Sequence, residues 1–273
     1  MKAAPNFLKP IIERKRVRLD AARRSIPLER QRRLAQQARL NANPHTFLAA
    51  LRHEGRVNII AEFKRASPSK GIIREGAVCA EVAAEYERAG ASAISVLTEE
   101  DYFSGSLDDL RAARCAVSLP LLRKDFIFDE YQLYEAAEAG ADALLLIAAA
   151  LEDDQLRRLR RITEEELKMD ALVEAHTIEE LGRAIDCGAS IVGVNNRNLC
   201  TLNVSLDVSI ELASRVGGEV LLVSESGIHS ADDIRRLREV GYRGFLIGEL
   251  LMRAERPGAA LRALMTKTES ASS

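Results

Sequence analysis

The feature that most constrains the fold is a regular alternation, starting at Val57, of short aliphatic runs and longer amphipathic stretches. Eight runs are short and consist mainly of β-branched or other aliphatic residues, which predicts strands. They are Val57–Phe63, Ala93–Leu97, Leu119–Arg123, Ala143–Ile147, Ala171–Glu174, Ile191–Asn195, Val220–Ser224 and Gly244–Ile247. Strands that alternate with helices in this way indicate βα units and a parallel sheet.

The stretches between the runs carry helix start and stop signals: a polar residue precedes the helix and a glycine follows it. The clearest predicted helices are Tyr131–Ala139 (Asp129 before, Gly140 after), Ile178–Cys187 (Thr177, Gly188) and Ile234–Val240 (Ser230 with Asp233, Gly241). The step Ala-Gly-Ala at 89–91 recurs at 139–141 and is echoed by Cys-Gly-Ala at 187–189. This repetition favours repeated βα units over two unlike domains.

Eight βα units fit a closed barrel better than an open doubly wound sheet. The chain has 273 residues, and one barrel typically needs about 250. An open dinucleotide-binding sheet would show a Gly-x-Gly-x-x-Gly turn, and the sequence has none. We predict an α/β fold, a (β/α)8 TIM barrel with an N-terminal helical extension. Its predicted parts are the extension (1–50), the catalytic barrel (51–265) and a polar, frayed C-terminal tail (266–273).

The first fifty residues are Arg-rich and helical in pattern, which predicts one or two amphipathic helices and no strand. Clustered arginines are compatible with an arm that binds nucleic acid. Glu13, Asp20 and Glu29 interrupt the arginines, and this interleaving favours a solvated helix face instead.

Composition limits the class of partner and the compartment. The formal net charge is −2, so no global field attracts nucleic acid or an anionic membrane, and we expect a small-molecule partner. No apolar run reaches the roughly 20 residues needed to span a bilayer, and no signal core follows the basic N-terminus. We therefore expect a cytoplasmic protein. The cysteines form no Cys-x-x-Cys pair, which favours reduced thiols over a disulfide or zinc framework; they are Cys79, Cys115, Cys187 and Cys200.

Charged and amide side chains follow the apolar runs at the ends of five predicted strands. They are Glu62 and Lys64, Lys124, Glu174, Asn195 and Glu225. Active sites of such barrels form at the carboxyl ends of the strands, so these groups would converge on one mouth. A network of buried ion pairs is the structural alternative. Desolvating so many charges costs several kcal/mol each unless they are well paired, and a barrel does not need them for stability, so we favour function.

A second signal indicates a phosphate site. Ser226-Gly227 follows the seventh strand and Gly248-Glu249 the eighth, and small residues at these turns let backbone N–H groups approach an anion. Ser67, in the Gly-containing stretch after the first strand, is a further candidate for substrate or phosphate contact, with a plain surface turn as the alternative. The four histidines lack metal-ligand spacing, and no nucleophile elbow or Walker loop is present, so we predict no metal site.

At these positions the chain closely resembles the indole-3-glycerol-phosphate synthase family. The matching segments run in family order over nearly the whole barrel, and the N-terminal Ile11–Lys15 is similar to the family's leading helix. The barrel segments are Ile59–Gly71, Ser95–Gly105, Leu122–Phe126, Tyr131–Leu151, Leu172–His176, Val192–Leu199, Ser224–Ile228 and Phe245–Glu249.

The resemblance implies a carboxy-lyase reaction of tryptophan biosynthesis on 1-(2-carboxyphenylamino)-1-deoxyribulose 5-phosphate: ring closure, loss of CO2 and loss of water, without a cofactor. It implies that Lys124 is the general acid of ring closure and Glu174 its acid–base partner. Substrate handling and dehydration fall to Glu62 and Lys64, and it leaves open which lysine acts in which step. The resemblance also implies that Asn195 and Glu225 hold the reacting substrate by hydrogen bonds. It places Ser67, Arg197, Ser226, Gly227, Gly248 and Glu249 in substrate and phosphate binding, the last through its backbone.

An apolar wall would suit the anthranilate ring, and its candidates are Leu97, Phe103, Phe126 and Leu146. The sequence departs from the family after Leu199. The family usually shows Arg-Thr-Phe-x-Val-Asp there, whereas residues 200–205 read Cys-Thr-Leu-Asn-Val-Ser, which puts the packing of the sixth loop in doubt.

Three alternatives remain at this stage. Phosphoribosylanthranilate isomerases share the phosphate corner but use a Cys and an Asp as acid and base, and no Cys here ends a predicted strand. A catalytically silent barrel would have lost the strand-end charges, which are intact. A specialised paralogue of the family would carry the same residues. We expect a monomer or a weak homodimer.

Overall fold

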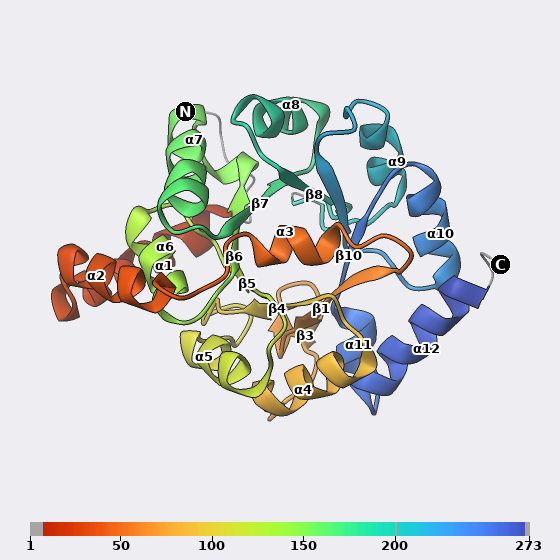
Figure 1. Cartoon of the computed structure of the whole chain (residues 1–273), viewed down its shortest axis with the longest axis horizontal. Coiled ribbons are helices and arrows are strands. Elements are labelled where there is room, and N and C mark those ends of the chain that lie inside the picture. Colours follow the sequence, from red (N-terminus) through yellow and green to blue (C-terminus); the bar gives the residue numbers. More distant parts are fainter. Residues whose placement is uncertain (1–7, 200, 271–273) are drawn as a thin grey trace.

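The computed structural model describes residues 8–199 and 201–270, with the side chains of 269 and 270 left out. Within these residues, eight parallel strands close into one barrel, and helices surround it (Figure 1). The order around the barrel is β1-β10-β9-β8-β7-β6-β5-β4. The short strands β2 (Ala66–Ser67) and β3 (Gly71–Ile72) form a separate hairpin after β1. The predicted (β/α)8 barrel is confirmed.

All eight predicted strands are present, with ends that differ by at most two residues. The barrel strands are β1 (Asn58–Phe63), β4 (Ala93–Leu97), β5 (Leu121–Lys124), β6 (Ala143–Ile147), β7 (Asp170–Ala175), β8 (Ile191–Asn195), β9 (Leu221–Glu225) and β10 (Gly244–Ile247). Four of them match the predicted bounds, because the apolar run there coincides with the hydrogen-bonded segment.

The three helices predicted from local signals are present, and they begin directly after Asp129, Thr177 and Ser230, as those signals indicated. Helices follow all the barrel strands. They are α4 (Cys79–Ala89), α5 (Leu107–Ala116), α6 (Glu130–Glu138), α7 (Asp153–Arg161), α8 (Ile178–Asp186), α9 (Asp207–Ala213), α10 (Ala231–Glu239), α11 (Glu249–Arg253) and α12 (Pro257–Ser270), with the short 3-10 segment Ala148–Ala150 and the π-helical segment Ile162–Glu166. Ser230 and Asp233 form a capping box that starts α10. Gly140 and Gly188 adopt left-handed backbone conformations, with φ of 89° and 85°, that reverse the chain after α6 and α8.

Alternate residues of each strand face opposite sides of the barrel wall. In β6, Leu145 and Ile147 point into the barrel, whereas Leu144 and Leu146 pack in the outer core against the helices. Leu146 is therefore not part of the apolar pocket wall, and that prediction is wrong. The apolar run identified the strand, but a fully buried strand gives no polar face from which to read the direction of each side chain.

Three helices precede the barrel: α1 (Leu8–Ser25), α2 (Leu28–Arg39) and α3 (Thr46–Leu51). The third was not predicted. In Figure 1 α3 lies across the centre of the barrel, and its Phe47 and Leu51 pack with the inward side chains Ile60 and Leu172. A six-residue helix is too short for a periodic pattern to reveal it, and the barrel interior stabilises it by accepting its apolar side chains.

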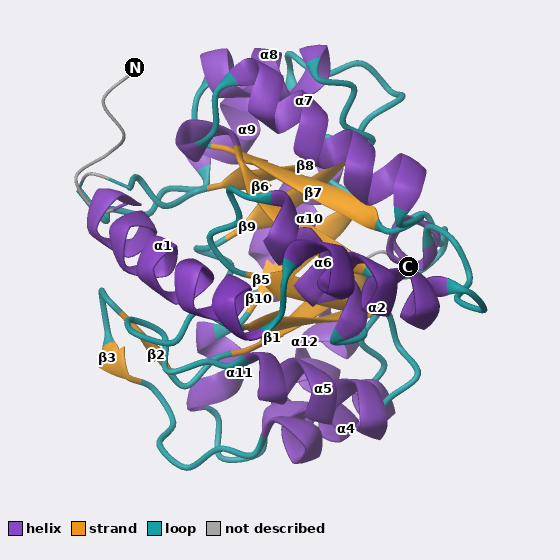
Figure 2. Ribbon diagram, turned by 90° about the vertical axis from the view of Figure 1, so that its left-hand side faces the viewer, coloured by secondary structure: helices purple, strands orange, loops and turns teal. Residues whose placement is uncertain are grey.

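Helix α1 lies at the same end of the barrel as the β2–β3 hairpin (Figure 2). Lys15 of α1 is buried, and its Nζ lies 2.8 Å from Asp125 Oδ2 and 3.0 Å from a Glu100 oxygen. Burial alone would raise the pKa of Asp125, but Lys15 and Arg123 lower it to about 2. The interpretation of the N-terminal segment as a solvated helix face is therefore wrong for Lys15, because ion pairs with the barrel compensate its burial.

The end of the chain also differs from the expectation of a frayed tail. Helix α12 continues to Ser270, and Thr268 is buried with its hydroxyl donating to the Leu264 carbonyl at 2.9 Å. Packing of α12 on α4, α10 and α11 sustains a helix whose last turns are polar in sequence. Residues 271–273 lie outside the described residues.

We expect Lys15→Ala to lower the free energy of unfolding by about 3 kcal/mol, because it removes the ammonium partner of the buried Asp125 carboxylate. Urea unfolding monitored by circular dichroism measures this change. Lys9→Ala, at an exposed position of the same helix, is the matched control and should change the free energy by less than about 0.5 kcal/mol. Equal unfolding midpoints for the two variants would contradict a stabilising role for Lys15.

Candidate active site

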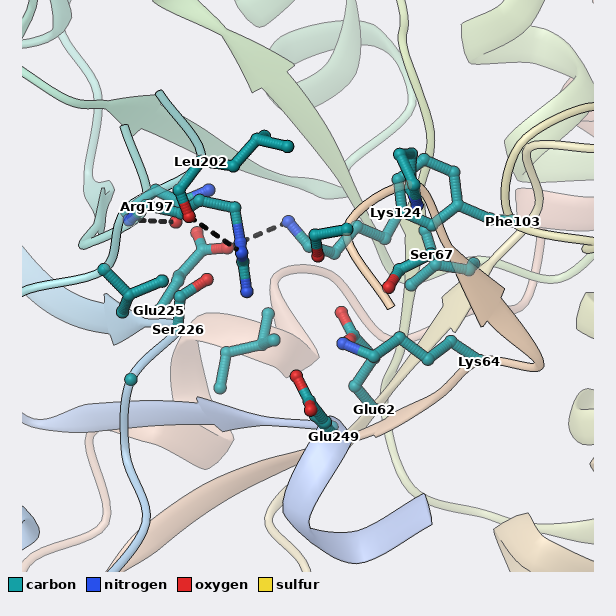
Figure 3. A pocket seen from close by; sticks show the side chains of 18 of the residues that line it. Glu62, Lys64, Ser67, Phe103, Lys124, Arg197, Leu202, Glu225, Ser226 and Glu249 are labelled. Carbon is teal, nitrogen blue, oxygen red and sulfur yellow. Dashed lines mark hydrogen bonds and ion pairs between the residues drawn. The ribbon is translucent and has the colours of Figure 1, made fainter. Parts of the chain in front are cut away.

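A cavity of about 700 Å³ opens at the carboxyl ends of the barrel strands. Its volume lies within the range usual for small-molecule sites. All twelve predicted site residues line it: Glu62, Lys64, Ser67, Lys124, Glu174, Asn195, Arg197, Glu225, Ser226, Gly227, Gly248 and Glu249. Figure 3 labels most of their side chains. The structure therefore brings together residues that lie up to 187 positions apart, from 62 to 249, in one pocket.

Lys124, at the end of β5, is the centre of the charged cluster. Its Nζ lies 2.9 Å from Glu225 Oε2 and 3.2 Å from Glu174 Oε2, so one ammonium bridges β5, β7 and β9. Beside it, Lys64 Nζ donates to Glu62 Oε1 at 2.6 Å. Figure 3 shows Lys124 extending across the pocket toward Glu225. With every group ionised, the cluster holds three carboxylates and two ammoniums.

Strand periodicity explains why these side chains meet. Glu62 and Lys64 continue the inward series that begins with Ile60, and Lys124 continues the series of Leu122. In the same way Glu174 follows the inward Leu172 in β7. The inward residues below the mouth are apolar and those at the mouth are charged, so each strand changes from core to site within two residues.

Burial and neighbouring charges set the protonation of the cluster. Burial lowers the pKa of Lys124, but Glu225, Glu174 and Glu62 outweigh it, and the net pKa is raised. Burial raises the pKa of Glu174, but Lys124 and His176 outweigh it, and the net pKa is lowered. Burial, reinforced by Glu174, raises the pKa of Glu225 to about 7 against the opposing effect of Lys124. Lys124 and Glu174 are therefore charged at neutral pH, while Glu225 titrates there.

Two glycines provide the space that the carboxylates occupy. A Cβ atom at Gly193 in β8 would overlap with Glu225 Oε1, and one at Gly248 would overlap with Glu62 Oε1. Sequence reasoning placed Gly248 at the phosphate corner and did not identify Gly193. A glycine inside a strand, opposite a strand that ends in a carboxylate, is the signal that could have found it.

The predicted phosphate corner lies on the β9 and β10 side of the cavity. Ser226 and Gly227 both adopt left-handed conformations, with φ of 66° and 78°, so the chain turns sharply directly after Glu225. Asn196 fixes this turn, because its Nδ2 donates to the carbonyls of Glu225 and Ser226 at 3.1 and 3.0 Å. The strained backbone at a non-glycine residue is typical of functional turns.

Polar side chains surround this corner. The Glu249 carboxylate lies 3.1 Å from Arg253 and 3.5 Å from Lys70, so two cations compensate its charge at the cavity wall. Arg197 donates to the Leu202 carbonyl at 3.2 Å from the loop after β8. The departure from the family pattern at residues 201–204 lies along the cavity wall; Cys200 is outside the described residues.

The apolar wall faces the cavity from β4, β5 and β6. Leu97, Phe103 and Phe126 line it as predicted, and Leu145 and Ile147 take the place expected for Leu146. The rings of Phe103 and Phe126 are 6.1 Å apart between centroids and are tilted by 41°. A flat aromatic ring fits beside such a tilted pair.

Sequence reasoning missed three polar residues that support the site: the buried Glu99 and Asn196, and the mostly buried His176. Glu99 accepts hydrogen bonds from the backbone N–H groups of Asp101, Tyr102 and Phe103, and so holds the Phe103 loop in place. Each of the three directly follows a strand or lies within two positions of its end, and within two positions of a residue that was predicted. That position is the signal that could have identified them.

Among the described residues, no group of three or more His, Cys, Asp or Glu side chains is arranged to hold a metal ion. The thiols of Cys79, Cys115 and Cys187 are free. In the part of the chain that the structure describes, no helix has the length and apolar character needed to cross a membrane.

Comparison with known proteins identifies the family. The sequence model of indole-3-glycerol phosphate synthase matches residues 8–264. The chain belongs to the indole-3-glycerol phosphate synthase family. An indole-3-glycerol phosphate synthase of Carboxydothermus hydrogenoformans is 48% identical over 263 residues, which cover 95% of this chain and 99% of the relative. One of Polaromonas naphthalenivorans is 44% identical over 262 residues, covering 95% and 98%.

Solved structures of other proteins share the fold alone. KGPDC from Streptococcus mutans aligns with a TM-score of 0.61 at 14% identity, over 79% of this chain and 98% of that one. Thiamine phosphate pyrophosphorylase from Pyrococcus furiosus aligns with a TM-score of 0.59 at 17% identity, over 78% and 96%. The barrel is thus common to several proteins, and the resemblance to the synthase family rests on sequence.

We expect Glu225→Gln to stabilise the fold at pH 8 by roughly 1–3 kcal/mol, with the difference closing near pH 4.5. The pKa of Glu225 is raised from 4.5, the value of an exposed glutamate, to about 7. Between pH 4.5 and pH 7 the folded state therefore keeps a proton that the unfolded state has already released. The contribution of this group to stability is therefore present at low pH and is lost as the pH rises through 7.

Urea unfolding at several pH values measures this dependence. Glu219→Gln, at an exposed position, is the control that should follow the parent protein. A Glu225→Gln variant that is less stable than the parent at every pH would contradict a raised pKa.

We expect Gly193→Ala to lower kcat of the family reaction at least about tenfold while keeping the fold, because the new methyl group displaces only the flexible end of Glu225 from Lys124. Steady-state kinetics and thermal unfolding check the two parts of this expectation. Gly182→Ala is the matched control, since nothing lies within 4 Å of a Cβ atom there. Equal kcat values for the two variants would show that the position of Glu225 is unimportant.

Proposed function

We propose that this chain catalyses the synthase reaction of tryptophan biosynthesis, in which 1-(2-carboxyphenylamino)-1-deoxyribulose 5-phosphate becomes indole-3-glycerol phosphate. The observation that carries the proposal is the buried Lys124 ammonium between Glu174 and Glu225, in a cavity with an apolar wall on one side and a phosphate corner on the other. This arrangement matches a substrate with an aromatic ring at one end, a phosphate at the other and a carbonyl between them.

Binding fixes the two ends of the substrate. The phosphate lies at the turns Ser226-Gly227 and Gly248-Glu249, with Ser67 of the β2–β3 hairpin and Arg197 of the loop after β8 closing over it. The anthranilate ring packs against Leu97, Phe103 and Phe126. Fixing both ends brings the aromatic carbon close to the carbonyl carbon and supplies much of the orientation that ring closure needs.

Lys124 acts at ring closure. The aromatic carbon that bears the carboxylate attacks the ribulose carbonyl, a C–C bond forms, and the carbonyl oxygen takes up a proton from Lys124 to become a hydroxyl. Before transfer, the ammonium stabilises the negative charge that develops on that oxygen. The raised pKa of Lys124 keeps it protonated at the start of the cycle, and Glu174 is its acid–base partner.

The remaining steps are loss of CO2 and loss of water, which complete the aromatic indole. The pair Glu62 and Lys64 handles the substrate and supports the dehydration, while Asn195 and Glu225 hold the reacting region by hydrogen bonds. Glu225 Oε1 is buried without a hydrogen-bond partner among the described residues, so this carboxylate has unused acceptor capacity. The overall reaction is redox-neutral, so it needs no redox cofactor.

Within the chain, residues 51–265 form the catalytic barrel and residues 1–50 the helical extension. The partner is a small sugar-phosphate substrate, with no nucleic acid and no membrane, and the chain acts in the cytoplasm as a monomer or a weak homodimer. The near-neutral charge supports a partner other than nucleic acid or an anionic membrane.

We expect Lys124→Ala to lower kcat by at least about a thousandfold while the fold is kept, because the acid and the electrostatic partner of the carbonyl are both removed. Indole fluorescence on mixing with the carboxyphenylamino-deoxyribulose phosphate, without added metal or nucleotide, measures the rate. The chain contains no tryptophan, so the background is low.

Lys124→Arg is the matched variant, since it keeps the positive charge but holds its proton too tightly to donate it. It should remain folded and retain binding, with turnover close to that of Lys124→Ala. Near-normal turnover in Lys124→Ala would remove Lys124 from its role. No indole signal from folded wild-type protein that binds the substrate would contradict the proposed function and favour a silent barrel or a specialised paralogue.

A further inference from the structure

His176, directly after β7, carries an imidazole that is only 9% exposed and does not line the cavity. It follows Glu174 by two positions, so both side chains lie on the same face of the strand. Its Nε2 is 3.3 Å from Glu174 Oε1, the carboxylate oxygen that does not contact Lys124. The ring therefore lies behind Glu174, and Lys124 lies in front of it.

The start of α8 holds this imidazole in place. Glu180 Oε2 accepts a hydrogen bond from the His176 backbone N–H at 2.7 Å and lies 3.1 Å from His176 Nδ1. Thr177 caps the same helix, because its hydroxyl accepts from the Glu180 backbone N–H. One carboxylate thus fixes both the backbone and the ring of His176, so the ring orientation is coupled to the helix cap.

We propose that His176, held by Glu180, is a positioning residue that directs Glu174 Oε2 toward Lys124. This inference rests on the proposed function of the site. His176 Nε2 has no hydrogen bond of good geometry among the described residues, so its interaction with Glu174 is electrostatic at the present 3.3 Å and can tighten as the substrate binds.

The charges around His176 favour its protonated form. Carboxylates face it from three elements: Glu174 of β7, Glu225 of β9 and Glu180 of α8. Burial lowers the pKa of His176, but these three groups outweigh burial and raise it above its ordinary 6.5. A protonated ring donates from both nitrogens, one toward each glutamate. As the pH rises through this pKa, Nε2 loses its proton, its lone pair faces Glu174 Oε1, and the ion pair of Glu174 with Lys124 is weakened.

His176→Gln and His176→Asn separate positioning from helix capping. The glutamine amide reaches the place of Nε2 and keeps a donor toward Glu174, whereas the asparagine amide reaches only the place of Nδ1 and keeps a donor toward Glu180. We expect His176→Gln to keep kcat within about threefold of the parent, and His176→Asn to lose about tenfold in kcat with KM unchanged.

The pH profile of kcat gives a second readout. The parent should lose activity on an alkaline limb that follows the titration of His176, and this limb should be absent in His176→Gln. Glu180→Gln keeps a hydrogen-bonding cap but removes a charge, and should move the limb to lower pH. NMR of the imidazole protons in the unmodified protein, which has four histidines, should report a pKa for His176 that matches the limb.

Any of these measurements can contradict the positioning role of His176. Equal kcat in His176→Gln and His176→Asn, or a larger loss in His176→Gln, would overturn it. An alkaline limb that stays at the same pH in Glu180→Gln would also overturn it. A pKa of His176 below 6.5 in the parent protein would do the same. These results leave the proposed function intact as long as the parent forms indole, whereas failure of the parent to do so would contradict the function itself.

Discussion

The buried Lys124 ammonium is the interaction on which the active site depends. An ammonium removed from water costs several kcal/mol unless carboxylates compensate it. Here Glu174 and Glu225 do so, and they come from β7 and β9 while the lysine comes from β5. A closed barrel places the ends of these three strands around one point. The charged cluster therefore depends on the barrel topology.

The residues next to the cluster are held as firmly as the cluster itself. Asp125, which follows Lys124, is bound by Lys15 from α1 and by Thr98 at the end of β4. On the opposite side Asn196 fixes the turn after Glu225. Preorganised neighbours of this kind matter because a charge that stabilises a developing oxyanion acts only if it does not have to move during the reaction.

The same cluster is a compromise between stability and activity. Three carboxylates and two ammoniums lie in a small volume. Burial and the neighbouring Glu174 disfavour the charged form of Glu225 and raise its pKa to about 7. Gly193 and Gly248 give up side-chain packing to leave room for Glu225 and Glu62. A barrel selected for stability alone would fill these positions with apolar side chains.

The amino-acid pattern alone specified the eight strands, their alternation with helices and the charged and amide residues at the strand ends, because apolar periodicity and strand-end charges are local properties. Arg197 was placed in the site only by the resemblance to the family. The pattern did not determine that α3 would pack into the barrel or that Lys15 would be buried, since both depend on segments distant in the chain. It also assigned Leu146 to the wrong face, because a strand buried on both sides shows no polar alternation. The protonation of Lys124, Glu174 and Glu225 was decided by the tertiary structure, because a pKa depends on burial and on charges brought within about 3 Å from other strands.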